Sequence, residues 1–373
     1  MKKYEDVMMA CALAAEECGL SLDYDPAVMV EDISELATED WVQLRRTGIG
    51  GSDAGTCMDV NAYSSKTELV MDKLGELPEK EVSPKTQFIF DYGHQMESCL
   101  GNFFASFTGF RVFKDNRMFY HPLYPWMHAN CDGFAVDSDG YKCLLEFKTG
   151  NPQACGFWKS GTLGEDAVLY RAEYEYQVRH YMAILNIFRA YIIVGFDNNA
   201  DNIKIIRVDR DISKEVALIN READLWKNYI SKGIVPVETK YSDASYKSIR
   251  SAVKADPKSE RKMIPDALKS NLEELVSLNS QKSELNARIN SIEERINALK
   301  LPVETEMGEA IEGYMPISDT EEYAITFKAT VREGISGEKL KQLKVNDPDI
   351  FKKYGSVSEN RTLRVTVKKP KRK

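Results

Sequence analysis

The stretch ANCDGFAVDSDGYKCLLEFKTG, residues 129–150, decides how this chain is expected to fold. Its centre, DSDG at 137–140, is a cluster of turn-forming residues with apolar runs on both sides, which predicts an antiparallel hairpin. Asp132 and Glu146 are equally distant from the middle of the turn, so they should lie opposite each other, or within one residue of it, on the same side of the sheet. Lys148, two residues beyond Glu146, shares that face.

Two carboxylates and a lysine on one buried sheet face cost free energy unless something compensates their charges. The neighbours Leu144, Leu145 and Phe147 are apolar, so most of the hairpin should be buried. A divalent cation would compensate the carboxylates, and oxygen ligands suit Mg²⁺ or Mn²⁺. A buried ion-pair network would also do so. The spacing alone leaves both interpretations open.

The hydrophobic pattern around this hairpin predicts a small α/β domain. Apolar runs of strand length predict strands at 117–121, 128–136, 141–148, 189–196 and 203–209. Helical spacing predicts helices at 4–18, 86–108, 166–187 and 212–232, and the capping box from Ser65 to Glu68 opens a further helix through Leu74. This order of elements indicates a central mixed sheet flanked by helices.

The charge of the chain is concentrated at its N-terminus. The 373 residues include 50 Lys+Arg and 58 Asp+Glu, a net charge of −8 that argues against a simple basic nucleic-acid-binding module. Residues 1–40 carry 11 acidic and two basic residues, whereas the remainder is almost neutral. We therefore interpret residues 1–40 as an acidic N-terminal extension.

Other features of the sequence indicate a cytoplasmic protein. Its apolar runs are shorter than a membrane helix requires, and Glu5 and Asp6 interrupt a start that otherwise resembles a signal peptide. The seven Cys are an odd number and lack zinc or iron–sulfur spacing, which is typical of reduced thiols.

The region 236–373 is predicted to be an accessory C-terminal part. Eight of ten heptad positions over 268–299 are Leu or Ile, and Asn271 and Lys282 interrupt the seam. We favour a helical hairpin that turns at Asn279-Ser280; a coiled-coil surface for another protomer or protein is the alternative. Short strands at 323–329 and 362–367, a helical stretch near 337–353 and a basic tail complete a small β extension.

Three further segments carry polar groups that suit a site. Glu97 lies on the predicted helix 86–108, and Gln177 lies on the predicted helix 166–187. A Gly-rich turn ends at Ser52 and opens a helix, seven residues after Arg45, an arrangement that can cradle an anion. Taken singly, these residues also fit plainer roles: a solvated carboxylate, a surface amide and a tight loop.

In combination, the segments resemble the PD-(D/E)xK nuclease superfamily, and within it the lambda exonuclease group and the YqaJ-like viral recombinases. Five motifs carry the resemblance in order: LRRTGIGGSDAG (44–55), GHQMES (93–98), ANCDGF (129–134), LLEFKTG (144–150) and YQVRHYMAIL (176–185). The resemblance implies a restriction-endonuclease-like nuclease core over 41–235. The coiled segment and the C-terminal end look like the extension of the longer phage members, and residues 1–40 lie outside the match.

The resemblance implies a catalytic metal site. Asp132 and Glu146 would be metal ligands, Glu97 would complete the site, and the backbone carbonyl of Phe147 is a further candidate ligand. Lys148 would position or activate the attacking water.

The resemblance also implies residues that hold the phosphate. Gln177 would orient the catalytic lysine or the water, and Arg45 and Ser52 would hold a terminal 5′ phosphate. Arg179 stands where relatives often have a second Gln, and we assign it to DNA binding. Asn130 replaces a small hydroxyl residue of lambda exonuclease, so the chain departs from its relatives around the phosphate.

The implied function is that of a Mg²⁺-dependent deoxyribonuclease of phage-type recombination, with Mn²⁺ as a possible substitute. It would digest linear double-stranded DNA 5′-to-3′ and leave 3′ single strands for a single-strand annealing protein. The resemblance also implies a homo-oligomer, a trimer in lambda exonuclease, in the cytoplasm of a bacterium or phage-infected cell.

Two alternatives remain: a structure-specific or nicking endonuclease with the same metal site, and a non-catalytic DNA-binding assembly protein. If DNA is bound, the acidic charge of 1–40 should oppose it, and deletion of 1–40 should tighten DNA binding at low salt.

Overall fold

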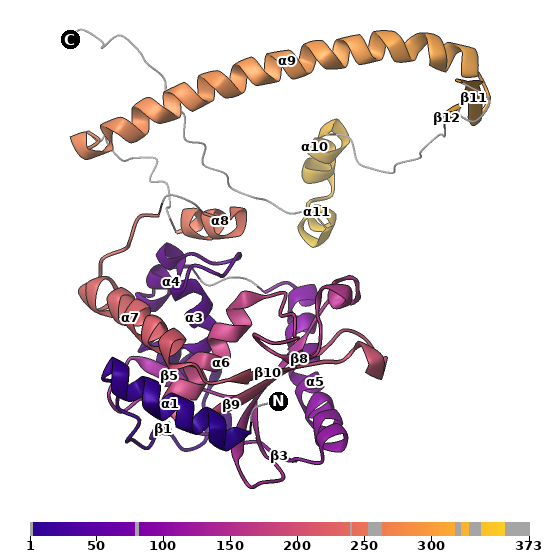
Figure 1. Ribbon diagram of the computed structural model, residues 1–373. Coiled ribbons are helices and arrows are strands. Elements are labelled where there is room, and N and C mark those ends of the chain that lie inside the picture. The colour runs from indigo at the N-terminus through magenta and orange to yellow at the C-terminus, as the bar shows by residue number, and fades with distance from the viewer. Residues whose placement is uncertain are drawn as a thin grey trace. The chain divides into compact units, whose positions relative to one another are not determined.

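The computed structural model describes residues 3–78, 82–238, 241–252, 263–317, 322–327 and 337–354. The chain divides into two compact units, Met1–Lys254 and Ala255–Lys373 (Figure 1). None of the described helices is long and apolar enough to cross a membrane.

The larger sheet of the first unit has six strands in the order β3-β6-β7-β9-β10-β8. These strands are Arg111–Phe113 (β3), Gly133–Val136 (β6), Lys142–Thr149 (β7), Gly161–Thr162 (β8), Arg189–Gly195 (β9) and Lys204–Asp209 (β10). β7 and β9 run parallel, whereas β6–β7 and β9–β10 are antiparallel. The predicted mixed sheet is confirmed.

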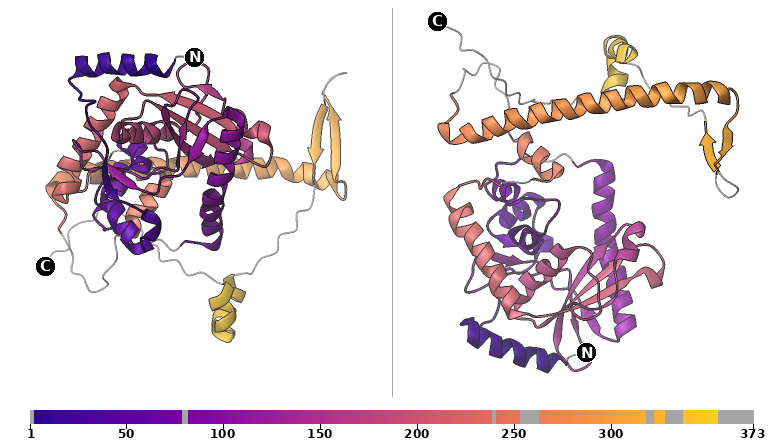
Figure 2. Two further views of the ribbon diagram at one scale, coloured as in Figure 1. Left: turned by 90° about the horizontal axis from the view of Figure 1, so that it is seen from below. Right: turned by 45° about the horizontal axis from the view of Figure 1, so that its top comes forward.

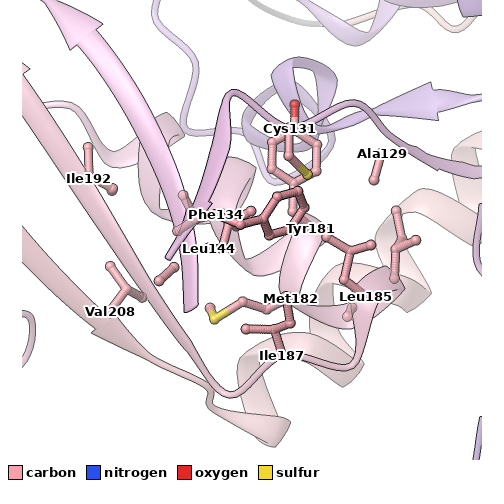
Figure 3. Close-up of a cluster of buried hydrophobic side chains, with 14 of the residues drawn as sticks. Ala129, Cys131, Phe134, Leu144, Tyr181, Met182, Leu185, Ile187, Ile192 and Val208 are labelled. Carbon is pink, nitrogen blue, oxygen red and sulfur yellow. The ribbon is translucent and has the colours of Figure 1, made fainter. Parts of the chain in front are cut away.

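Helices pack against both faces of this sheet. On one face, Leu145 and Ile193 pack with Phe104 of helix α5 (Pro84–Thr108). On the other face, Leu144 packs in a cluster with helix α6 (Ala172–Leu185), which connects the parallel strands β7 and β9. Figure 3 shows part of this second cluster, in which Leu144, Ile192 and Val208 of the sheet lie to one side of Met182 of α6. Successive residues of a strand alternate between the faces, so β7 contributes to both cores.

The smaller sheet contains only part of the strand that the sequence predicts at 128–136. Its order is β1-β4-β5-β2, made of Ala27–Val30 (β1), Met118–Tyr120 (β4), Met127–Ala129 (β5) and Ile49–Gly50 (β2). The single strand predicted at 128–136 is therefore β5 in one sheet and β6 in the other. Asn130, Cys131 and Asp132 lie between them, where the chain passes from one sheet to the other.

The N-terminal segment packs onto the α/β domain. Helix α1 spans Tyr4–Cys18, as predicted, and its buried face contacts Ile212 of helix α7 (Ile212–Asn228). The Tyr4 hydroxyl donates to the carbonyl of Lys142 on β7 and accepts from the backbone N–H of Phe188, just before β9. Figure 2 shows α1 lying against the outside of this unit. This segment is therefore part of the folded unit.

Other helices of the first unit are α2 (Thr38–Arg46), α3 (Gly51–Cys57), α4 (Lys66–Lys73) and α8 (Asp243–Ser251). The Ser65 hydroxyl caps α4 by accepting from the N–H of Glu68, as its sequence predicts.

The second unit is built on one long helix. Its elements are α9 (Lys269–Met307), β11 (Glu312–Pro316), β12 (Glu322–Thr326), α10 (Gly337–Asn346) and α11 (Pro348–Tyr354). The predicted helical hairpin is wrong, because α9 runs unbroken through Asn279 and Ser280 (Figure 2). Asn and Ser cost a helix only tenths of a kcal/mol each, roughly, so this pair does not force a turn. The predicted strand 362–367 and the basic tail lie outside the described residues.

Candidate functional site

The β6–β7 hairpin sets the geometry of the site. Gly133 pairs with Leu145, so the register continues one step to place Asp132 opposite Glu146, as the turn spacing predicts. The Oδ2 of Asp132 accepts a hydrogen bond from the backbone N–H of Phe147 at 2.9 Å. This bond holds Asp132 against β7 although the residue itself lies before β6.

Alternation along β7 directs the polar side chains toward α6. Leu145 and Phe147 pack in the cluster with α5, whereas Leu144 packs in the cluster with α6. Glu146 and Lys148 therefore share the α6 face with Leu144. This arrangement brings a carboxylate and an ammonium to the end of a strand, beneath a helix.

Glu146 is buried with an incomplete set of partners. Its Oε1 accepts from Lys148 Nζ at 2.5 Å and from Gln177 Nε2 at 2.6 Å. Its Oε2 is buried and has no hydrogen-bond partner in the described part of the chain. Burial, followed by the charge of Asp132, raises the pKa of Glu146 to about 8. A buried carboxylate oxygen without a donor is a position where a cation would be stabilised.

Glu97 of α5 brings a third carboxylate near Asp132. Burial and the charge of Asp132 raise the pKa of Glu97, while Lys114, whose Nζ lies 3.6 Å from its Oε2, lowers it. Within the described residues no three His, Cys, Asp or Glu side chains already form a set of metal ligands. The unpaired Glu146 Oε2 and the raised pKa values of Glu146 and Glu97 nevertheless fit a divalent cation. Its charge would pair with the free oxygen and would stabilise the ionised form of both carboxyl groups.

Lys148 is held between an acid and an aromatic ring. Burial lowers the pKa of Lys148, but the charges of Glu146 and Asp132 outweigh burial and raise it above its usual range. Its Nζ also lies 5.1 Å from the centre of the Tyr174 ring. Lys148 is therefore a protonated hydrogen-bond donor at neutral pH.

The Gly-rich turn brings Arg45 and Ser52 together. Arg45, at the end of α2, donates through Nη2 to the Ser52 Oγ at 3.1 Å, and its guanidinium lies 4.8 Å from the Trp41 ring centre. The turn packs closely on α6: a Cβ at Gly51 would lie 2.4 Å from the Tyr181 ring. Only glycine permits this approach of the turn to the helix.

One pocket of about 560 Å³ joins these parts. Its lining includes residues from every predicted segment: Arg45, Ser52, Glu97, Asn130, Asp132, Phe147, Lys148 and Gln177. Glu146 lies beneath the lining, bonded to Lys148 and Gln177. The structure therefore brings together every site residue proposed from the sequence except Arg179.

Arg179 lies away from the pocket, contrary to its predicted contact with DNA. Its Nε donates to Glu175 Oε1 at 2.8 Å, its Nη1 donates to the carbonyl of Asp209, and the side chain is buried. Residues two apart on a helix point about 200° from each other, so Gln177 and Arg179 cannot face the same site. Arg179 fastens α6 to the end of β10.

Sequence reasoning missed two aromatic residues of the pocket. Tyr174 stacks beside Lys148, and the Tyr181 hydroxyl accepts a 3.4 Å hydrogen bond from Gln177 Nε2. Both line the pocket. Their spacing of three and four residues from Gln177 places all three on one face of α6, and that spacing is the signal that could have identified them.

Comparisons with known proteins agree with the motif resemblance. Residues 40–187 match the model of the YqaJ-like viral recombinase domain, which confirms that resemblance. Over 322 residues the chain is 25% identical to the uncharacterized protein YqaJ of Bacillus subtilis (strain 168), covering 86% of this chain and 91% of the relative.

Two solved structures resemble part of the chain. An alkaline exonuclease, LHK-Exo, from Laribacter hongkongensis matches with a TM-score of 0.40 and 18% identity, covering 52% of this chain and 94% of that one. A phage related exonuclease from Haemophilus somnus 129PT matches with a TM-score of 0.36 and 12% identity, over 50% and 94% of the respective chains.

Proposed function

We propose that this chain, whose residues 40–187 belong to the YqaJ-like viral recombinase domain family, is a metal-dependent nuclease that hydrolyses the DNA backbone. One observation carries the proposal: the buried Glu146 has an oxygen without a donor, Asp132 lies opposite it, and Lys148 shares its face. The Asp132 carboxylate opposite Glu146 gives a cation a second oxygen ligand, which a single buried ion pair does not offer.

Asp132 and Glu146 would hold Mg²⁺, or Mn²⁺ in its place, with Glu97 and the Phe147 carbonyl as further ligands. When bound, the cation supplies positive charge that polarises the scissile phosphate and lowers the pKa of water. Gln177 fixes the Glu146 carboxylate through Oε1 and leaves Oε2 facing the proposed ligand. The positive Lys148 donates hydrogen bonds that orient the attacking water or the phosphate oxygen.

Arg45 and Ser52 are the proposed phosphate ligands. Arg45 offers a guanidinium fork and Ser52 a hydroxyl in the same pocket as the carboxylates, and their mutual hydrogen bond pre-orients both. We propose that they receive the 5′ phosphate of linear duplex DNA and that digestion proceeds 5′-to-3′, leaving a 3′ single strand. The family resemblance supports this direction, a homo-oligomer and a single-strand annealing partner.

Incubation with linear and covalently closed circular duplex DNA in Mg²⁺ tests the activity. Linear DNA should be degraded and circular DNA should persist; EDTA and the Lys148→Ala variant should each abolish degradation. Cleavage of the circle would identify an endonuclease instead. Persistence of both substrates, with DNA still bound, would identify a non-catalytic binding protein.

A matched pair of arginine variants tests end recognition. Arg45→Gln should slow digestion of 5′-phosphorylated ends and bring its rate toward that of 5′-hydroxyl ends. Arg46→Gln removes the same charge from the next residue, which pairs with Asp72 at 3.8 Å, and should retain the preference. If both variants prefer 5′-phosphorylated over 5′-hydroxyl ends to the same degree, Arg45 does not bind the 5′ phosphate.

A further inference from the structure

Helix α9 carries an apolar stripe that the described chain leaves exposed. Leu285, Ile292 and Leu299 are 57%, 58% and 67% exposed, although they occupy heptad core positions. The exposed members of this α9 stripe are Leu278, Leu285, Ile289, Ile292, Ile296 and Leu299. Its C-terminal end borders β12, yet Leu299 there remains the most exposed of the set. Such a stripe on a soluble helix indicates a partner surface.

The stripe has the length and period of a two-stranded coiled coil. Its core positions alternate in steps of three and four from Leu275 to Leu299, all of them Leu or Ile except Lys282, and the pattern ends just before Pro302. The heptads from 268 to 299 extend over about 48 Å at 1.5 Å per residue. More than four heptads of this kind are enough for helix pairing. In heptad notation, Leu275, Lys282, Ile289 and Ile296 are a positions, and Leu278, Leu285, Ile292 and Leu299 are d positions.

A parallel pair of α9 helices would be opposed by its own charges. In a parallel coiled coil each a residue meets its own copy, so the two Lys282 side chains would share one core layer. On the flanks, Arg295 at a g position would face Lys300 at an e position of the other copy. Both contacts join like charges, and although Arg288 at g would meet Glu293 at e of the other copy, the Lys282 layer in the core disfavours this orientation.

An antiparallel pair removes both conflicts. Core layers then join an a residue of one copy with a d residue of the other, so Lys282 meets Leu285, and Leu275 meets Ile292. The g positions face each other, which brings Glu274 of each copy beside Arg295 of the other. Both of these side chains are exposed on α9, and in the described part of the chain neither makes an ion pair.

We propose that α9 pairs with the α9 of a second copy as an antiparallel coiled coil, centred between residues 283 and 284. The pairing is two-fold symmetric, so it closes after two helices. The symmetry repeats the Glu274–Arg295 contact at both ends of the pair. Between these two contacts, the core layers bury the apolar side chains of the α9 stripe. The lysine stem of Lys282 lies along Leu285 while its ammonium reaches the edge of the interface.

Charge reversals distinguish this arrangement when the particle mass of the full chain is measured against concentration. Glu274→Arg should weaken pairing about tenfold and halve the number of chains per particle, because it sets the new guanidinium against Arg295 at both ends of the pair. Arg295→Glu should also weaken it, whereas in a parallel pair this change would relieve the contact with Lys300 and strengthen association. The double variant should restore the wild-type mass.

A control and a core variant complete the test. Glu294→Arg makes the same charge change at an outward-facing f position and should leave the mass unchanged. Leu278→Asp should abolish pairing, with circular dichroism confirming that the first unit stays folded. A wild-type mass in both Leu278→Asp and Glu274→Arg would overturn the proposal, and so would tighter association of Arg295→Glu.

Discussion

Asp132 lies opposite Glu146 across the β6–β7 hairpin, and the charge of Asp132 helps to raise the pKa of Glu146 to about 8. Together with burial, the charge of Asp132 also raises the pKa of Glu97. Asp132 is therefore the centre of the acidic cluster, and the removal of its charge has consequences for both neighbours.

Asp132→Asn should make the metal-free protein more stable and inactive. Asn keeps the acceptor for the Phe147 N–H but removes a charge that repels the buried Glu146 carboxyl and the half-buried Glu97 carboxyl, so the free energy of unfolding in EDTA should rise by about 1 kcal/mol. Cleavage in Mg²⁺ should be lost. Urea unfolding and nuclease assays measure both effects. Asp139→Asn, an equal charge change in the exposed hairpin turn, should alter neither.

Gly51→Ala should destabilise the protein by about 1–3 kcal/mol. The new methyl group would lie 2.4 Å from the buried Tyr181 ring, so either α3 or α6 has to shift. Since Tyr181 contacts Gln177, the shift should also reduce cleavage. Gly156→Ala is the control, because a Cβ there meets no atom within 4 Å. Equal stability of the two variants, measured by urea unfolding, would contradict the close packing.

The N-terminal segment should be needed for stability. Deletion of residues 1–40 is therefore a poor test of how the charge of this segment affects DNA binding. Tyr4→Phe removes a hydroxyl that bonds to the backbone at Lys142 and Phe188 and should cost about 1–2 kcal/mol in urea unfolding. Tyr63→Phe, at a ring that is 63% exposed, should cost little. A similar cost in both variants would contradict the proposed anchoring.

Deletion of residues 1–40 would uncover the core surface beneath α1, so a change in DNA affinity would then report damage to the fold. Neutralising the exposed Glu16 and Glu17 to Gln tests the electrostatic effect with the helix in place. Tighter DNA binding at low salt is the expected result.

His121 should make the protein less stable in acid. Burial, with a contribution from the charge of Arg210, lowers the pKa of His121 from 6.5 to about 4, and its Nδ1 accepts from the N–H of Leu123. Between these two pKa values the unfolded chain binds a proton that the folded chain does not. The free energy of unfolding therefore falls as the pH decreases through that window, by about 2 kcal/mol at pH 5.

His121→Asn keeps an acceptor for Leu123 but cannot take up the proton. The variant should lose less stability than the wild type between pH 7 and pH 5, by about 2 kcal/mol in urea unfolding. An unchanged difference would show that His121 is protonated in the folded state.

Local signals were enough to predict the parts of the fold that depend on neighbouring residues. The turn at 137–140 gave the correct register for Asp132 and Glu146, and α1 has the predicted bounds. Both depend on short-range patterns: turn chemistry in the first case, and helical spacing ended by Gly19 in the second. The family resemblance named eight side chains, of which six line one pocket and a seventh, Glu146, lies beneath its lining.

Long-range partners could not be predicted from those patterns. The division of 128–136 between two sheets depends on β2, which pairs with β5 from almost 80 residues upstream. Arg179 was misplaced because a motif match gives its position in sequence, whereas its side of α6 follows from the helical turn. The predicted helical hairpin is wrong because Asn279 and Ser280, although weak helix formers, lie within the 39 continuous residues of α9. Once a helix has formed on both sides, two such residues do not interrupt it.

The anchoring of Tyr4 has a consequence during protein synthesis. Tyr4 is synthesised before both of its partners: its acceptor at Lys142 is 138 residues later and its donor at Phe188 is 184 residues later. At 5–20 residues per second, α1 waits about 10–40 s for the second of these partners. During that time Val7, Cys11 and Ala15 have no core to cover them. Helix α1 is thus made long before the surface on which it docks, and until then its apolar face is open to chaperones or to misassembly.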